Sequence, residues 1–77
     1  MVISEKVRVI TDFSKIFFVE WKNRSYKVDK VGFHHFLLEG KTLMHVFSVI
    51  SGSIFLKIKL DTKHLAWTLE EIQDNGI

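Results

Sequence analysis

The fold is decided by residues 43–69, which read LMHVFSVISGSIFLKIKLDTKHLAWTL. Apolar and polar residues alternate along this stretch, and two polar interruptions divide it into three expected strands. The first interruption, Ser51-Gly52, is predicted to be a two-residue hairpin turn, because glycine supplies the positive φ that such turns need. The second, residues 61–64, is predicted to be a four-residue loop. The stretch therefore predicts an antiparallel three-stranded meander.

These two connections define an expected register. Counting outward from them pairs Val49 with Ile54, Phe47 with Leu56, His45 with Ile58 and Leu43 with Leu60, and it sets Leu65, Trp67 and Leu69 opposite Leu60, Ile58 and Leu56. One face is then apolar except for His45, and Phe47, Val49, Ile54, Leu56, Ile58 and Trp67 are its predicted core residues. The opposite face carries Ser48, Phe55, Lys57, Lys59, Thr68 and Glu70. This alternation is typical of an antiparallel sheet with one solvated face.

The remainder of the chain predicts further strands at residues 5–11, 16–21 and 25–31. The last two are expected to form a hairpin whose turn is centred on Asn23-Arg24, with Trp21 opposite Tyr26. Residues 31–40, VGFHHFLLEG, fit either one helical turn or an irregular apolar crossover, and residues 71–77 are expected to form a frayed tail. The predicted fold is one all-β domain over residues 1–77. It is a small SH3-like or partly closed barrel of five to six antiparallel strands, built from a hairpin and a three-stranded meander.

Length and composition restrict the class of protein. A chain of 77 residues has room for one domain, and 47% hydrophobic residues are a large apolar load for so small an interior, so part of that load is expected at an interface. Without cysteine the chain has no disulfide, and it shows neither a signal-peptide run nor an apolar run long enough to span a membrane. The expected location is the cytoplasm, without membrane contact. A net charge of +2 is well below that of a dedicated nucleic-acid binder.

Residues 17–31 (FFVEWKNRSYKVDKV), together with MHVFSV, SGSIFLKIKLD and HLAWTL further along, resemble a family of small uncharacterised prokaryotic β domains. Members of that family stand alone or lie at the C-terminus of inactive relatives of Y-family translesion DNA polymerases. The resemblance implies an accessory role around DNA damage tolerance, and it implies structural roles for Trp21, Tyr26, Phe47 and Trp67. The sequence departs from the family pattern at His34-His35, where a Trp-rich crossover is expected.

No catalytic signature is present in the sequence. It lacks a Gly-x-Ser-x-Gly elbow, a glycine-rich phosphate loop and paired interior carboxylates, so the protein is not expected to be an enzyme and no cofactor is expected. Adjacent residues of a strand point to opposite faces, which disfavours a shared metal ion at His34 and His35. His45 is predicted to be half-buried and hydrogen-bonded near the mouth of the barrel, in preference to acting as a ligand or a base.

Two functions remain open. The first is a protein-interaction or self-assembly module whose surplus apolar surface is contributed by Phe33, Phe36 and Leu37. The second is an accessory nucleic-acid-binding domain, in which outward Phe55 stacks on bases between basic side chains. The residues expected to bind nucleic acid are Phe55, Lys57, Lys59, Arg24, Lys22 and Lys27.

Overall fold

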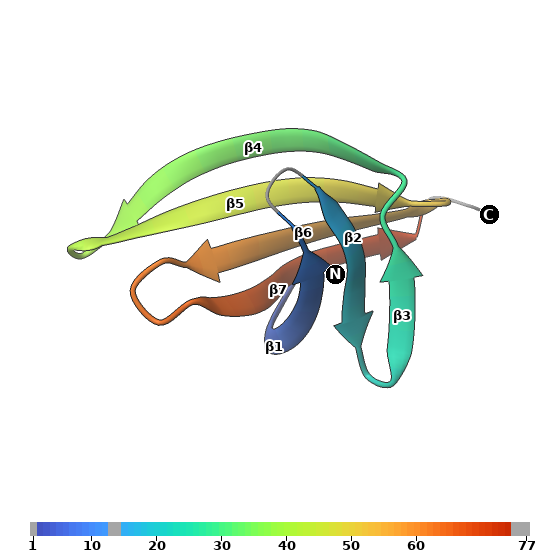
Figure 1. The fold of residues 1–77 in the computed structure, drawn as a ribbon, viewed down its shortest axis with the longest axis horizontal. Helices are drawn as coiled ribbons and strands as arrows, with labels where there is room; N and C mark the ends of the chain where they lie inside the picture. Colours follow the sequence, from blue (N-terminus) through green and yellow to red (C-terminus); the bar gives the residue numbers. More distant parts are fainter. Residues whose placement is uncertain (1, 13–14, 75–77) are drawn as a thin grey trace.

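The computed structural model describes residues 2–12 and 15–74 of the chain, and these residues form seven β-strands (Figure 1). The strands are β1 (Val2–Thr11), β2 (Ile16–Trp21), β3 (Arg24–Lys27), β4 (Lys30–Glu39), β5 (Thr42–Ser51), β6 (Ile54–Asp61) and β7 (Ala66–Asp74). The described residues contain no helix, and hence none that could cross a membrane.

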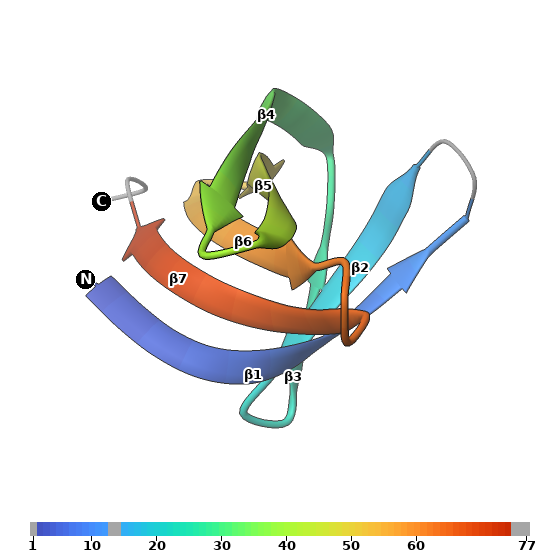
Figure 2. The same ribbon diagram turned by 90° about the vertical axis from the view of Figure 1, so that its left-hand side faces the viewer.

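All seven strands belong to one antiparallel sheet in the order β3-β2-β1-β7-β6-β5-β4. β1 pairs with both β2 and β7, so it joins the β2–β3 hairpin to the meander of β4 to β7. The sheet curls into a half-barrel, which is clear when it is viewed along the strands of the meander (Figure 2). The predicted all-β, partly closed barrel is confirmed. The expected count of five to six strands and the three-stranded meander are corrected to seven and four.

The additional strand is β4, which occupies residues 30–39 where the sequence suggested a helical turn or an irregular crossover. Both alternatives are wrong, and the expected strand 25–31 is divided between β3 and β4. A two-residue turn at Gly40-Lys41, with Gly40 at φ 63°, returns the chain so that β4 pairs with β5 along its length. The pairing of a neighbouring strand thus overrides the short helical spacing of Phe33, Phe36 and Leu37.

Each of the three expected hairpin registers is displaced by two residues. Val49 pairs with Leu56 and not with Ile54, Leu60 pairs with Trp67, and Val19 pairs with Tyr26. The reason is the position of each turn: Lys22 and Asn23 both take positive φ, and Gly52 is the first residue of its turn and not the second. Because side chains alternate with a period of two, a shift of two residues keeps every side chain on its expected face.

The loop between β6 and β7 spans residues 62–65 and not 61–64. The Asp61 carboxylate accepts hydrogen bonds from the backbone N–H groups of Lys63 and His64 at 2.8 and 3.1 Å, which holds the start of this loop. A hydrogen bond to the His64 ring, at 2.9 Å, lowers the pKa of Asp61. Leu65, expected to face inward, has φ 54° and is 75% exposed.

The main core lies on the concave side of the sheet, but Met44 and Val46 are buried on the convex side, which was expected to be solvated. Val19, Val49, Leu56, Ile58 and Leu69 are fully buried on the concave side, and Phe47, Ile54 and Trp67 pack against them. The predicted core residues of the meander are therefore confirmed. β7 continues through residues 71–74, where a frayed tail was expected, and residues 75–77 lie outside the described part of the chain.

Candidate interaction edge

The edge strand β4 carries the largest exposed apolar side chains of the sheet. Phe33 is 62% exposed, Phe36 61% and Leu38 69%, whereas Leu37 is half-buried. The structure thus places the predicted interaction residues Phe33, Phe36 and Leu37 on one strand, and it adds Leu38, which the sequence reasoning missed. The signal in the sequence was apolar character at both odd and even positions of residues 30–39, which is typical of a strand with two apolar faces.

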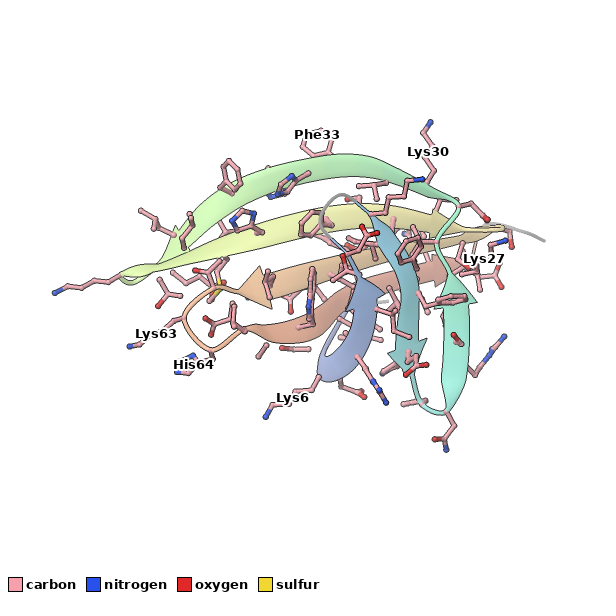
Figure 3. All side chains as sticks on the ribbon, in the orientation of Figure 1. Lys6, Lys27, Lys30, Phe33, Lys63 and His64 are labelled. Atoms are coloured by element: carbon pink, nitrogen blue, oxygen red, sulfur yellow. The ribbon has the colours of Figure 1, made fainter. Side chains whose placement is uncertain are left out.

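A bulge divides β4 into two segments. Val31 pairs with Val49, but Phe33 pairs with Ser48, so Gly32 is the extra residue. Because of this bulge Lys30, Phe33, Leu37 and Glu39 lie on the convex face, whereas Val31, His34, Phe36 and Leu38 lie on the concave face. Lys30 and Phe33 both point away from the body of the molecule (Figure 3).

The backbone of β4 alternates in its hydrogen bonding. The Glu39–Thr42 pair flanks the two-residue turn and is therefore a hydrogen-bonded pair, and hydrogen-bonded and non-hydrogen-bonded pairs alternate from there along β5. On this count His35 and Leu37 direct their N–H and C=O groups to β5, whereas His34, Phe36 and Leu38 direct theirs outward. Among the described residues β5 is the only strand beside β4. The outward groups are therefore available to a further strand.

A row of aromatic rings extends from β4 across the concave face. The rings of His34 and Phe47 stack with centroids 4.2 Å apart, and Phe36 meets the edge of His45 at 4.6 Å. Phe47 in turn lies 5.6 Å from Trp67 on β7. Rings at these distances attract one another by roughly 0.5–1.5 kcal/mol a pair. The row connects the exposed edge to the hydrophobic core.

His34 and His45 are hydrogen-bonded to each other, with 3.0 Å between Nε2 of His34 and Nδ1 of His45. His45 is half-buried, so the predicted half-buried, hydrogen-bonded histidine is confirmed. Desolvation is the main cause that lowers the pKa of His34, and the neighbouring His45 and His35 lower it further. The His34 imidazole borders a cavity of about 500 Å³, which is also lined by Ile16, Val31, Phe47, Leu60 and Trp67. The His45 ring stacks on His34 with centroids 5.2 Å apart.

His34 and His35 lie on opposite faces of β4, as the alternation of a strand requires. Within the described residues, no three side chains of histidine, cysteine, aspartate or glutamate are grouped as a metal site would need.

The basic residues proposed for nucleic-acid binding do not form one surface. Lys59 is held by two carboxylates, with its Nζ 2.8 Å from Oε2 of Glu39 and 3.4 Å from Oε1 of Glu70. The hydrogen bond to Glu39 is the main cause that raises the pKa of Lys59. Phe55 and Lys57 are half-buried on the same strand. This strand therefore offers less free positive charge than its sequence suggests.

The other three predicted basic residues lie on the β2–β3 hairpin. Lys22 lies over the Trp21 ring at 4.8 Å, Arg24 lies over the Tyr26 ring at 5.3 Å, and Lys27 is exposed. Lys22, Arg24 and Lys27 could extend the surface of β6 only if the two hairpins were neighbours in the sheet. β1 and β7 separate them, so the residues are not brought together.

Comparisons of the chain with protein-family models, with curated proteins and with solved structures find no match. The resemblance to the C-terminal domains of inactive Y-family polymerase relatives therefore stays a prediction. The function is argued below from the geometry of the sheet.

Proposed function

We propose that this protein is a non-catalytic, cytoplasmic interaction module that binds a protein partner by adding one of the partner's strands to β4. The observation that supports this proposal is β4 itself, a ten-residue edge strand with nine exposed positions. An added strand gains affinity from hydrogen bonds to the edge backbone and specificity from side chains on alternate faces. β4 offers both kinds of contact.

Exposed edges are usually protected by charge, by proline or by short length, since an unprotected edge pairs with other chains. Between its end residues, Lys30 and Glu39, β4 contains no lysine, arginine, aspartate, glutamate or proline. Exposed apolar side chains project from both faces, with Phe33 on the convex face and Phe36 and Leu38 on the concave face. A partner strand would bury apolar surface on both sides of the sheet, which favours association.

The test uses labelled ten-residue peptides of alternating apolar pattern, including one with the sequence of residues 30–39. Their binding is followed by fluorescence anisotropy, and amide hydrogen exchange is measured at β4. We expect saturable binding that slows exchange at His34, Phe36 and Leu38. Phe36→Pro removes an outward N–H and leaves the bonds to β5 intact, so it should abolish binding without unfolding the chain. Equal binding by Phe36→Pro, or no binding by any peptide, would overturn the proposal.

The alternative proposal is an accessory nucleic-acid-binding domain linked to DNA damage tolerance. It has less support, because Lys59 is engaged by Glu39 and Glu70. A titration with single-stranded oligonucleotides at two salt concentrations tests it, since binding through phosphate contacts weakens steeply as salt rises.

A further inference from the structure

We propose that the strand added to β4 is the β4 of a second copy of this chain, in an antiparallel two-fold register centred on His35. This inference rests on the proposed function and names its partner. It is carried by the residue order of β4, KVGFHHFLLE, read together with the bulge at Gly32.

A two-fold axis between identical antiparallel strands, perpendicular to the sheet, restricts the possible registers. The axis keeps the concave face of one copy continuous with the concave face of the other, so each residue must meet one from its own face. The residues with outward backbone groups, His34, Phe36 and Leu38, all lie on the concave face. Any register that pairs residues of the same face therefore also pairs outward backbone groups with each other. Only the complementarity of the side chains can distinguish these registers.

With His35 on the axis, each apolar residue meets an apolar or aromatic one. His34 lies opposite Phe36 of the second copy, and Phe33 lies opposite Leu37 of the second copy. Beyond the bulge, Val31 lies opposite Leu38 of the second copy. At each end of the pairing, Lys30 lies opposite Glu39 of the second copy, which joins opposite charges twice in the dimer. These matches follow from the faces assigned by the β4–β5 pairing.

The bulge is necessary for this result. Lys30 and Glu39 are nine positions apart, so they would lie on opposite faces of a regular strand. The extra residue Gly32 brings both onto the convex face, where Lys30 pairs with Ile50 and Glu39 pairs with Thr42 of β5. Glu39 already contacts Lys59, but its side chain remains 48% exposed and can accept a second cation.

Slipped registers lose these matches. Centring the axis on Phe36 sets Phe33 opposite Glu39 and Lys30 opposite Lys41, which joins like charges. Centring it on His34 sets Lys30 opposite Leu37 and Asp29 opposite Leu38. Like charges that face each other across strands are destabilising. The register centred on His35 is therefore the one that the side chains select.

The test exploits the absence of cysteine from the chain, because any single introduced cysteine is then the only thiol. His35→Cys places two thiols at a non-hydrogen-bonded pair, where Cα atoms lie about 4.5 Å apart, within the roughly 4.4–6.8 Å that a disulfide spans. Phe36→Cys and His34→Cys report the slipped registers, and Lys63→Cys in the exposed loop reports random collision. Oxidation is followed by non-reducing electrophoresis, and assembly by sedimentation of the unmodified chain.

We expect a dimer in sedimentation and disulfide formation at least tenfold faster for His35→Cys than for the other three variants. A chain that stays monomeric at high concentration, or faster cross-linking at residue 34, 36 or 63, overturns the proposal. If the peptides bind β4 while the chain stays monomeric, strand addition stands and self-pairing fails. If neither occurs, both proposals fail.

A charge change gives a second readout that does not depend on cysteine. Lys30→Glu sets two glutamates together at each end of the pairing, and we expect dimer affinity to fall about threefold to tenfold, as for exposed ion pairs. Lys27→Glu makes the same change of charge on β3, away from β4, and should leave the affinity unchanged. Equal effects of the two variants would contradict the register.

Discussion

Within residues 2–12 and 15–74, β3 and β4 are the two edges of one sheet, and each has a neighbouring strand on one side only. β3 is four residues long, carries Arg24 and Lys27, and buries one aromatic ring, that of Tyr26. β4 is ten residues long, has charges only at its ends and exposes Phe33, Phe36 and Leu38. Short length and positive charge protect an edge against pairing with other chains, and β4 lacks both.

The difference between the two edges shows which apolar side chains pack in the core and which remain exposed. On β3 the apolar side chain faces the core and stabilises the monomer, whereas on β4 most apolar side chains add little to the core and remain free to contact another chain. Substitutions on the two edges should therefore separate stability from association. The five predictions that follow are ordered by the expected size of their effect.

The largest contrast is between aromatic truncations on the two edges. Tyr26→Ala removes a ring that is 5% exposed, and it should lower the free energy of unfolding by about 3–5 kcal/mol. Phe33→Ala removes a ring that is 62% exposed, and it should change the same quantity by less than about 1 kcal/mol. Denaturant unfolding at a concentration where the chain is monomeric measures both. A larger loss for Phe33→Ala would show that β4 contributes to the core.

Lys59 should contribute more to stability than its position on the convex face suggests. Lys59→Met leaves the carboxylates of Glu39 and Glu70 without their shared cation, and we expect a loss of about 1–3 kcal/mol. Lys57→Met, two residues away on the same strand, is the control and should change stability by about 0.5 kcal/mol or less.

The contribution of Lys59 also has a defined pH dependence. Its pKa in the folded chain is raised above the usual 10.5, so the stabilisation is complete below pH 10.5 and is lost as pH rises through the folded-state pKa. Unfolding measured between pH 9 and pH 12 should show this loss in the unmodified chain and not in Lys59→Met.

Charge on the apolar edge should weaken association while sparing the fold. Leu38→Lys gives β4 the protection that β3 has, and it should weaken dimerisation or peptide binding at least tenfold, with a change in unfolding free energy of about 0.5 kcal/mol or less. Leu65→Lys is a matched control, because Leu65 is 75% exposed and lies in the β6–β7 loop, away from the edge. Sedimentation and anisotropy measure the binding. Equal weakening by the two variants would remove β4 from the interface.

The smallest effect concerns His34. Its folded-state pKa lies below the usual 6.5, so its contribution to stability is present above pH 6.5 and is lost as pH falls through the lower pKa. Thermal unfolding of the monomer between pH 8 and pH 5 should show a decline that His34→Gln reduces. His35→Gln, on the opposite face of β4, removes only the smallest of the three causes that lower the pKa of His34 and should keep most of the decline. An unchanged decline in His34→Gln would assign it to another group.

Prediction from the sequence succeeded where the two-residue alternation of side chains was enough to assign residues to a face of the sheet. The predicted core residues of β5, β6 and β7 share one face and His45 is half-buried, as expected, but Met44 and Val46 are buried on the face that was expected to be solvated. Registers were displaced by two residues because alternation cannot distinguish such a shift, and the choice depends on backbone angles such as the positive φ of Lys22. The role of residues 31–40 was missed because a short segment with apolar residues at both odd and even positions fits several local structures until β5 pairs with it.

The sequence by itself determined an all-β chain, the shared face of the main core residues of the meander, and an apolar surplus centred on Phe33, Phe36 and Leu37. These follow from local composition and alternation, which act within a few residues. Only the tertiary structure decided that this surplus lies on an edge strand without internal charge or proline, that a bulge at Gly32 brings Lys30 and Glu39 onto one face, and that Glu39 and Glu70 hold Lys59. These depend on strand order and register, which long-range pairing sets and local sequence leaves open.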